Sequence, residues 1–276
     1  MDEVNNMPFF YVTNARRGKQ VILLLIIAFF TALFFYVEFL AVSPSFSING
    51  QPKIIYKGEK GVALTFNIGW GDEKAEEILK ALKEENIDAA TFFLAGSWVE
   101  RHPHIVKLIT DQGYEIGLLG YSYNDYTELE EPEIERDIIK GLEAFRKAGI
   151  EKPLLLRTPT GDVDRRVLKI AEKSNLTLVH WSVNSMDWKN PGTKVIVKYI
   201  SHAKKGDIIL LHASDSAKQT AKAIPLIKEQ LTAKKLKLLS VSEMISNSKS
   251  TSHEISSTPF MLSTRPLRLD EKIQTN

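Results

Sequence analysis

From residue 61 onward, the chain alternates between two patterns of hydrophobic and polar positions. Short, nearly continuous apolar runs are separated by segments whose apolar residues recur at helical spacing. Continuous apolar runs of this length are typical of parallel strands buried on both faces. The predicted strands lie in VALTFNI, AATFFLAG, YEIGLLG, LLLRTP, LTLVHWS, DIILLHAS and LKLLSVS, which begin at residues 62, 89, 114, 154, 176, 207 and 236.

The segments between these runs have the pattern of amphipathic helices. In residues 72–86, apolar positions fall at i, i+3, i+4 and i+7 counted from Ala75, which places them on one helical face. Asp72 stands where it could cap the start of this helix. Residues 130–149 begin with acidic and end with basic side chains, the order that the helix dipole favours.

This alternation predicts an α/β domain over residues 61–247, folded as a distorted (β/α) barrel of about seven strand–helix units. An open, doubly wound sheet is the alternative. Residues 43–60 are predicted to be a short extended lead-in. Residues 248–276 are rich in Ser, Thr and charge and are predicted to be a disordered tail. In both folds we expect the chemistry where the strands end.

Residues 21–42 begin with an uncharged apolar run of about seventeen residues, close to the length that crosses a bilayer. Basic residues, among them Arg16 and Arg17, precede the run, and Glu38 is the first charge after it. By the positive-inside rule, residues 1–20 are expected in the cytoplasm and the barrel on the other side of the membrane. The sequence thus predicts one transmembrane signal anchor in the cell membrane. A cleaved signal peptide and a buried core helix are the alternatives.

Composition narrows the choice of partners. The formal net charge is +2, and no basic stripe interleaved with aromatic residues is present, so nucleic acid is not an expected partner. The chain has no cysteine, which excludes disulfides and thiolate metal sites. With hydrophobic residues at 43%, a domain of this size can form a sizeable core.

Five short motifs stand at the ends of predicted strands: TFNIG, EIGLLGYSY, RTPTG, SMDW and LLH. In order and spacing they resemble the motifs of the polysaccharide deacetylase family (carbohydrate esterase 4) over residues 53–247. GWGD, VHWSVNS and LLHASDSA resemble a sporulation-associated branch of that family from endospore-forming bacteria. The resemblance implies a deacetylase-type barrel and, as its partner, an N-acetylated glycan such as peptidoglycan.

The same resemblance shows where the chain departs from the family. Its first motif normally ends in a base aspartate and a metal-binding aspartate, but here Asn67 and Ile68 occupy those positions. Leu119 and Tyr123 occupy the positions of two histidines that help to bind a divalent metal such as zinc. Ile68 and Leu119 have no lone pair for zinc, and an amide is no base near neutral pH. No cofactor is therefore expected, and we predict that Ile68, Leu119 and Tyr123 close the metal position by apolar packing.

Other family positions are retained. The resemblance implies that His212 is the acid that protonates the leaving amine, that Asp187 orients it, and that Arg157 pairs with the base position, now Asn67. Arg157 and Asp187 in a buried ion network, and His212 as a core histidine, are the structural alternatives. The implied substrate-binding residues, which surround the acetyl group, are Pro159, Thr160, Trp188 and Leu210.

Two functions follow, and the sequence leaves both open. The first is hydrolysis of the C–N bond of N-acetylated sugars in peptidoglycan, acting in sporulation. The second is a non-catalytic glycan-binding or scaffold role that uses the same pocket. Asn67 and Ile68 discriminate between them, because these residues would cripple an enzyme but would leave a binding protein intact.

The remaining candidate ligands give weaker signals. His102 and the histidine two residues later lie at a predicted helix start and are expected in a solvated turn. His180 lies inside a predicted strand and is expected in the core. A replacement metal site could use Asp72 with Asp187 and His212, but only if the helix start lay close to the strand ends.

Overall fold

A computed structural model of the chain describes residues 22, 24–33, 54–150, 153–246 and 251–253. The chain divides into two compact units, residues 1–48 and 49–276. The described part of the first unit is helical. None of the helices in the described ranges combines the length and the apolar character needed to cross a membrane. The rest of the predicted anchor and the predicted cytoplasmic segment lie outside the described residues.

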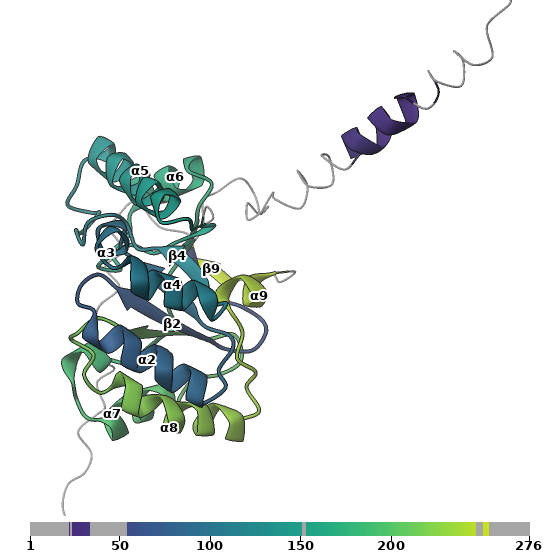
Figure 1. Ribbon diagram of the computed structural model, residues 1–276. Helices are drawn as coiled ribbons and strands as arrows, with labels where there is room; N and C mark the ends of the chain where they lie inside the picture. The colour runs from purple at the N-terminus through teal and green to yellow at the C-terminus, as the bar shows by residue number, and fades with distance from the viewer. Residues whose placement is uncertain (1–21, 23, 34–53, 151–152, 247–250, 254–276) are drawn as a thin grey trace, which may run out of the picture. The chain divides into compact units, whose positions relative to one another are not determined.

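The second unit is built on one sheet, part of which is seen at the centre of Figure 1. In the described part of the chain its strand order is β7-β8-β2-β3-β4-β5-β6-β1-β9. Strands β1 to β8 pair in parallel, and β9 pairs antiparallel with β1. The strands are β1 (Ile54–Lys57), β2 (Ala63–Ile68), β3 (Thr91–Leu94), β4 (Glu115–Leu118), β5 (Leu155–Leu156), β6 (Thr177–Val179), β7 (Val183–Asn184), β8 (Ile208–His212) and β9 (Thr251–His253).

The strand order is that of a barrel opened at one seam. The late strand β8 pairs with the early strand β2, so the sheet wraps back on itself. A doubly wound sheet would instead reverse direction at its first strand. The seam lies between β7 and β1, because β7 is one edge of the described sheet and β1, with β9 beside it, lies at the other. The predicted α/β barrel class is confirmed as a half-barrel of eight parallel strands.

Helices cover the outside of the sheet. Figure 1 shows α2, α7 and α8 grouped on one side of β2, and α3 to α6 on the other. The helices are α2 (Glu73–Glu84), α3 (Gly96–Arg101), α4 (Pro103–Asp111), α5 (Glu131–Lys147), α6 (Arg165–Lys173), the 3-10 turn η1 (Asp187–Lys189), α7 (Thr193–Ile200), α8 (Thr220–Ala233) and α9 (Val241–Ile245).

Helix α2 forms as its pattern predicts, with one difference at its start. The apolar face that begins at Ala75 is fully buried in the core. Asp72 occupies the N-cap position, but its side chain makes no capping hydrogen bond. The backbone N–H of Lys74 instead donates to Asp215, which follows β8, at 3.1 Å. The cap of α2 therefore comes from the far end of the barrel sequence.

One predicted strand is wrong. The segment LKLLSVS, residues 236–242, makes only an isolated parallel bridge from Leu238 to Val62 and then turns into α9. Ser240 and Glu243 form a capping box at the start of this helix. Reciprocal capping satisfies two backbone N–H groups that a strand would have to pair, so the local cap outweighs the apolar pattern.

Two segments predicted to lie outside the barrel contribute strands to the sheet. Within the predicted lead-in, β1 pairs with β6, and its residues Ile54 and Ile55 are buried in the core. Within the predicted tail, β9 pairs with β1. The other residues of the predicted tail, 248–250 and 254–276, lie outside the described residues. The described part of the barrel therefore extends beyond the predicted limits of 61–247 at both ends.

Candidate functional site

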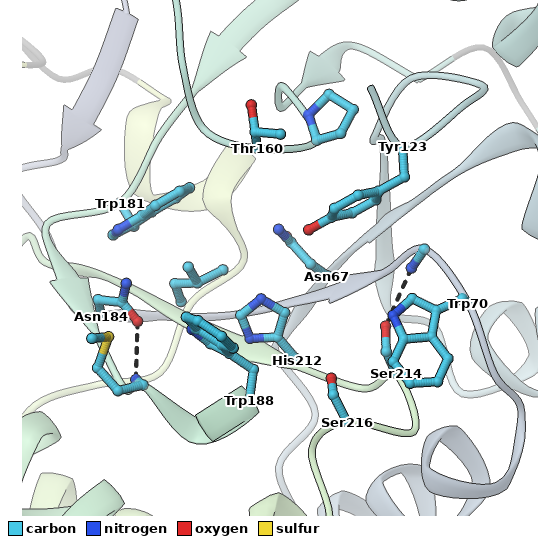
Figure 2. Close-up of a pocket in the computed structure, with 14 residues that line it drawn as sticks. Asn67, Trp70, Tyr123, Thr160, Trp181, Asn184, Trp188, His212, Ser214 and Ser216 are labelled. Carbon is cyan, nitrogen blue, oxygen red and sulfur yellow. Dashed lines mark hydrogen bonds between the residues drawn. The ribbon is translucent and has the colours of Figure 1, made fainter. Parts of the chain in front are cut away.

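The carboxyl ends of β2, β7 and β8 and the loops after β4, β5 and β6 surround a cavity of about 370 Å³ (Figure 2). Carboxyl ends of parallel strands are where α/β barrels place their sites. The cavity is lined by Asn67, Gly69, Trp70, Tyr123, Pro159, Thr160, Trp181, Asn184, Met186, Trp188, Leu210, His212, Ser214 and Ser216.

The end of β2 places one of two neighbouring residues in the cavity. Successive side chains of a strand point to opposite faces. Asn67 therefore lines the cavity, whereas Ile68 is fully buried in the hydrophobic core. In the register of the sheet Asn67 lies beside His212 of β8. These two polar residues thus share one end of the cavity.

Behind Asn67 lies a fully buried guanidinium, that of Arg157. Its Nη1 donates to Asn67 Oδ1 at 2.9 Å and to Thr65 Oγ1 at 2.9 Å. Its other N–H groups donate to the carbonyl oxygens of Val179 and His180, and it stacks on the ring of Phe93 at 4.0 Å. Burial lowers the pKa of Arg157 to about 9, so it remains a cation near neutral pH.

The buried carboxylate of Asp187 holds the His212 side chain in place. Its Nδ1 lies 2.8 Å from Asp187 Oδ1, and its backbone N–H donates to Asp187 Oδ2 at 2.8 Å. Thr220 Oγ1 and the backbone N–H of Trp188 complete the hydrogen bonds to this carboxylate. Burial alone would raise the pKa of Asp187, but the hydrogen bonds from His212 and Thr220 keep it below the usual value. Asp187 is therefore ionised and fixes the orientation of the imidazole.

A strained turn presents Asp187. It opens the 3-10 turn η1, and the residues on either side, Met186 and Asn190, have φ of 56° and 52°. Asn tolerates this left-handed conformation, but Met does so at a cost, because its Cβ approaches the backbone. The hydrogen bond from the Met186 backbone N–H to Asn184 Oδ1 at 2.9 Å, drawn in Figure 2, helps to hold the turn.

Aromatic side chains form much of the wall. Trp70, Tyr123 and Trp188 line the cavity and remain 52%, 49% and 43% exposed, so their ring faces are open to a ligand. Trp181 is held in place by stacking on His180, with the ring centroids 3.7 Å apart. It also packs closely against Gly161, where an added Cβ would lie 2.5 Å from the Trp181 ring. Rings held in this way supply flat apolar contact with little loss of conformational entropy.

The residues present do not fit the divalent metal that the resemblance implies. Ile68 and Leu119 are fully buried and lie outside the cavity, and Tyr123 lines the cavity without closing it. Both oxygens of Asp187 already accept two hydrogen bonds each, which leaves no lone pair for a cation. Within the described ranges, no three His, Asp or Glu side chains are grouped so that they could hold a metal. Asp72 lies instead 3.9 Å from His102.

Comparison with known proteins identifies the family. The model of the polysaccharide deacetylase family matches residues 55–179. A peptidoglycan-N-acetylglucosamine deacetylase from Bacillus cereus is 33% identical over 191 residues, which cover 68% of this chain and 89% of that protein. The chain belongs to the polysaccharide deacetylase family.

Two other relatives are informative for a deacetylase-family chain with these replacements. The uncharacterized protein YlxY of Bacillus subtilis is 31% identical over 74% of this chain, which spans 64% of YlxY. The crystal structure of a CE4 family pseudoenzyme from Bacillus anthracis has a TM-score of 0.67 and 30% identity, covering 73% of this chain and 72% of that one. A mutant of that pseudoenzyme, also at a TM-score of 0.67, is described as having restored enzymatic activity.

The structure brings most of the predicted deacetylase-family site residues together. Asn67, Tyr123, His212 and all four residues implied as substrate contacts line the cavity, while Arg157 and Asp187 lie directly behind it. The buried His180 is a core residue, as predicted. The sequence motifs contained Trp70, Trp181, Asn184, Met186, Ser214 and Ser216 but gave no sign that these line the cavity.

Proposed function

We propose that this deacetylase-family protein binds N-acetylated cell-wall glycan, such as peptidoglycan, in the cavity of Figure 2 and does not hydrolyse it by the family's metal-dependent reaction. The observation that carries the proposal is the hydrogen bond between the Asn67 side-chain amide and Arg157. The carbonyl oxygen of Asn67 is committed to Arg157, and an amide cannot take a proton from water near neutral pH. Among the described residues, no group of His, Asp or Glu side chains could hold a metal, which supports the same proposal.

Glycan binding requires neither a general base nor a metal, and groups that can contact an N-acetylated sugar line the cavity. An acetyl methyl group can lie between Leu210, which is almost fully buried, and the ring of Trp188. The backbone N–H of Thr160 is then a donor for the acyl oxygen. The open rings of Trp70 and Tyr123 can stack on the sugar faces next to the acetyl group. The B. cereus relative, named for action on peptidoglycan N-acetylglucosamine, supports this class of ligand.

A second candidate function is slow hydrolysis that uses His212 alone. The 2.8 Å contact between His212 Nδ1 and Asp187 favours it, because a buried carboxylate orients the ring for proton transfer to a leaving amine. A group that activates the attacking water would then have to come from the substrate or from a partner.

One experiment separates the two candidates. The full-length chain, in mild detergent, is incubated with chito-oligomers and peptidoglycan fragments with and without zinc, and both acetate release and glycan binding are measured. Binding without release, with binding lost in Trp188→Ala, is the expected result. Release that disappears in His212→Ala would establish the second candidate. Loss of binding in a well-folded wild-type chain would overturn both.

A restored variant tests the reason for inactivity. It returns an acid or an imidazole to each replaced position: Asn67→Asp, Ile68→Asp, Leu119→His and Tyr123→His. With zinc, we expect the folded variant to release acetate at least tenfold faster than wild type, because a base and a metal-activated water each contribute on the order of a hundredfold or more. A folded variant that binds zinc but stays inactive would contradict our account.

We further propose a location and a setting. The apolar run in residues 21–42 and the basic residues before it support a membrane anchor with the barrel on the extracytoplasmic side, where peptidoglycan lies. The resemblance of GWGD and LLHASDSA to a sporulation-associated branch supports a role in spore formation. Protease accessibility of the barrel in intact protoplasts tests the orientation, and spore yield after deletion tests the role.

A further inference from the structure

Arg157 is a buried cation without an anionic partner. All four of its hydrogen bonds go to neutral oxygens, those of Thr65, Asn67, Val179 and His180. Among the described residues no ion pair within 4.0 Å includes it. A fully desolvated charge is costly unless an opposite charge lies near it. The end of the cavity at Asn67 therefore has a positive potential.

Arg157 fixes the orientation of the Asn67 side-chain amide. Guanidinium groups only donate, so the amide must turn its oxygen to Arg157, and the nitrogen is left as the free end. Figure 2 shows the Asn67 side chain extending from β2 into the space that Tyr123, Trp181 and His212 surround. A ligand at this end of the cavity meets an N–H donor backed by a cation.

The side chains that line the described cavity carry no negative charge to offset that of Arg157. None of the residues that line the cavity in the described structure is an Asp or a Glu. One carboxylate, that of Asp187, lies behind His212 with both oxygens hydrogen-bonded inside the protein. The lining side chains include further donors, such as the amide nitrogen of Asn184 and the hydroxyl of Tyr123. Charge and hydrogen-bonding polarity thus favour the same kind of ligand.

We propose that the cavity selects ligands that carry a carboxylate, with the carboxylate at the N–H end of Asn67, over neutral ligands of the same shape. Either a free small acid or a saccharide can carry this carboxylate, and the two share the same chemistry. The inference rests on the proposed function, since it takes this cavity as the glycan site, and it adds the charge of the preferred ligand.

Matched pairs of probes test the inference in the full-length chain. Acetate and acetamide have the same shape and differ in charge, and glucuronate and glucose are the corresponding saccharide pair. Binding is measured by titration calorimetry or by competition against a chito-oligomer. We expect acetate to bind about tenfold or more tightly than acetamide, as one partly desolvated charge pair provides. A stronger preference in the saccharide pair would indicate a sugar acid, and a preference in the acetate pair alone a free acid.

Two variants test whether the preference for acetate over acetamide depends on Asn67. Asn67→Asp keeps the shape and places a carboxylate against Arg157, so the preference for acetate should fall about tenfold or more while acetamide binding changes little. Asn175→Asp changes the net charge equally at an exposed position outside the cavity and should leave the preference unchanged.

The outcomes distinguish this inference from the proposed function. Equal or weaker binding of acetate relative to acetamide overturns the inference, as does a preference that persists in Asn67→Asp. If chito-oligomers still bind in a manner that depends on Trp188, the proposed function stands without it. If no chito-oligomer binds, the proposed function fails, whatever the result with acetate.

Discussion

Replacing a carboxylate by an amide at one residue changes what this family's site can do. In Asn67 an NH₂ group stands where the resemblance implies a second carboxylate oxygen. From the sequence alone we predict the loss of the base and of the metal ligands, because this prediction depends only on residue types; it stays a prediction. The lack of an ion pair for Arg157 among the described residues and the direction of the Asn67 amide could not be predicted. They depend on which neutral oxygens β2 and the end of β6 bring around the guanidinium.

Asn67→Asp should stabilise the folded chain. The new carboxylate would pair with buried Arg157, and we expect a gain of about 2 kcal/mol in the free energy of unfolding at pH 7. Because pairing lowers the pKa of the new acid in the folded state, the gain should be present above about pH 4 and be lost as the pH falls through the lowered value. Urea unfolding at pH 7 and pH 3 measures both, with Asn175→Asp as the control.

His180 should make stability depend on pH. Burial, together with the nearby charge of Arg157, lowers its pKa in the folded state to about 4. Since the unfolded pKa is about 6.5, the neutral histidine contributes stability that is full above pH 6.5 and is lost as the pH falls through 4, about 3 kcal/mol in all. In His180→Gln this loss should largely disappear. His202→Gln, at an exposed position, should keep it; equal pH profiles for the two variants would refute the argument.

At the scale of elements, helix caps show how distant residues can replace local ones. Asp72 has the sequence position of a cap for α2, but the bond to the Lys74 N–H comes from Asp215. We therefore expect Asp215→Ala to cost about 1 kcal/mol and Asp72→Ala much less. Thermal unfolding of the two variants measures the difference. A larger effect of Asp72→Ala would mean that the local cap forms in solution.

The elements that hydrophobic pattern could predict are those whose burial is regular, continuous along a strand or periodic along a helix. Strand β2 and helix α2 were found for this reason. Strand β7 has only two residues, Val183 and Asn184, both partly exposed, and so carries no apolar run. It exists because β8 provides a partner at the open seam. Likewise, Trp181 and Asn184 reach the cavity through the path of the loop between β6 and β7, which no local period encodes.

At the scale of the whole molecule, one carboxylate holds the open seam of the barrel. Asp207 is almost fully buried and pairs with Lys57, which ends β1, at 2.7 Å. It also accepts from Ser182 Oγ, between β6 and β7, at 2.8 Å, and from the Lys204 backbone N–H. This side chain joins the two sides of the seam together with an isolated backbone bridge between Lys57 and Asp207 and a hydrogen bond from the Gly58 N–H to the Gly206 carbonyl.

Asp207→Asn should weaken the whole fold. The amide loses its ion pair with Lys57 and turns an N–H towards groups that donate, which we expect to cost about 2 kcal/mol of the free energy of unfolding. Asp111→Asn breaks an exposed pair with Lys107 and should change little. Denaturant unfolding compares them, and similar small losses in both would show that the seam is held by other contacts.

The pairing of β2 with β8 also has a consequence for biosynthesis. Asn67 and His212 are neighbours in the sheet although almost the whole barrel separates them in the chain. Contacts between residues so distant in sequence form late and slowly. While the ribosome is still making the later strands, β2 therefore has only β3 as a neighbour and exposes an apolar edge. The nascent chain should depend on chaperones until β8 is complete, and no product truncated before β8 can contain the complete cavity.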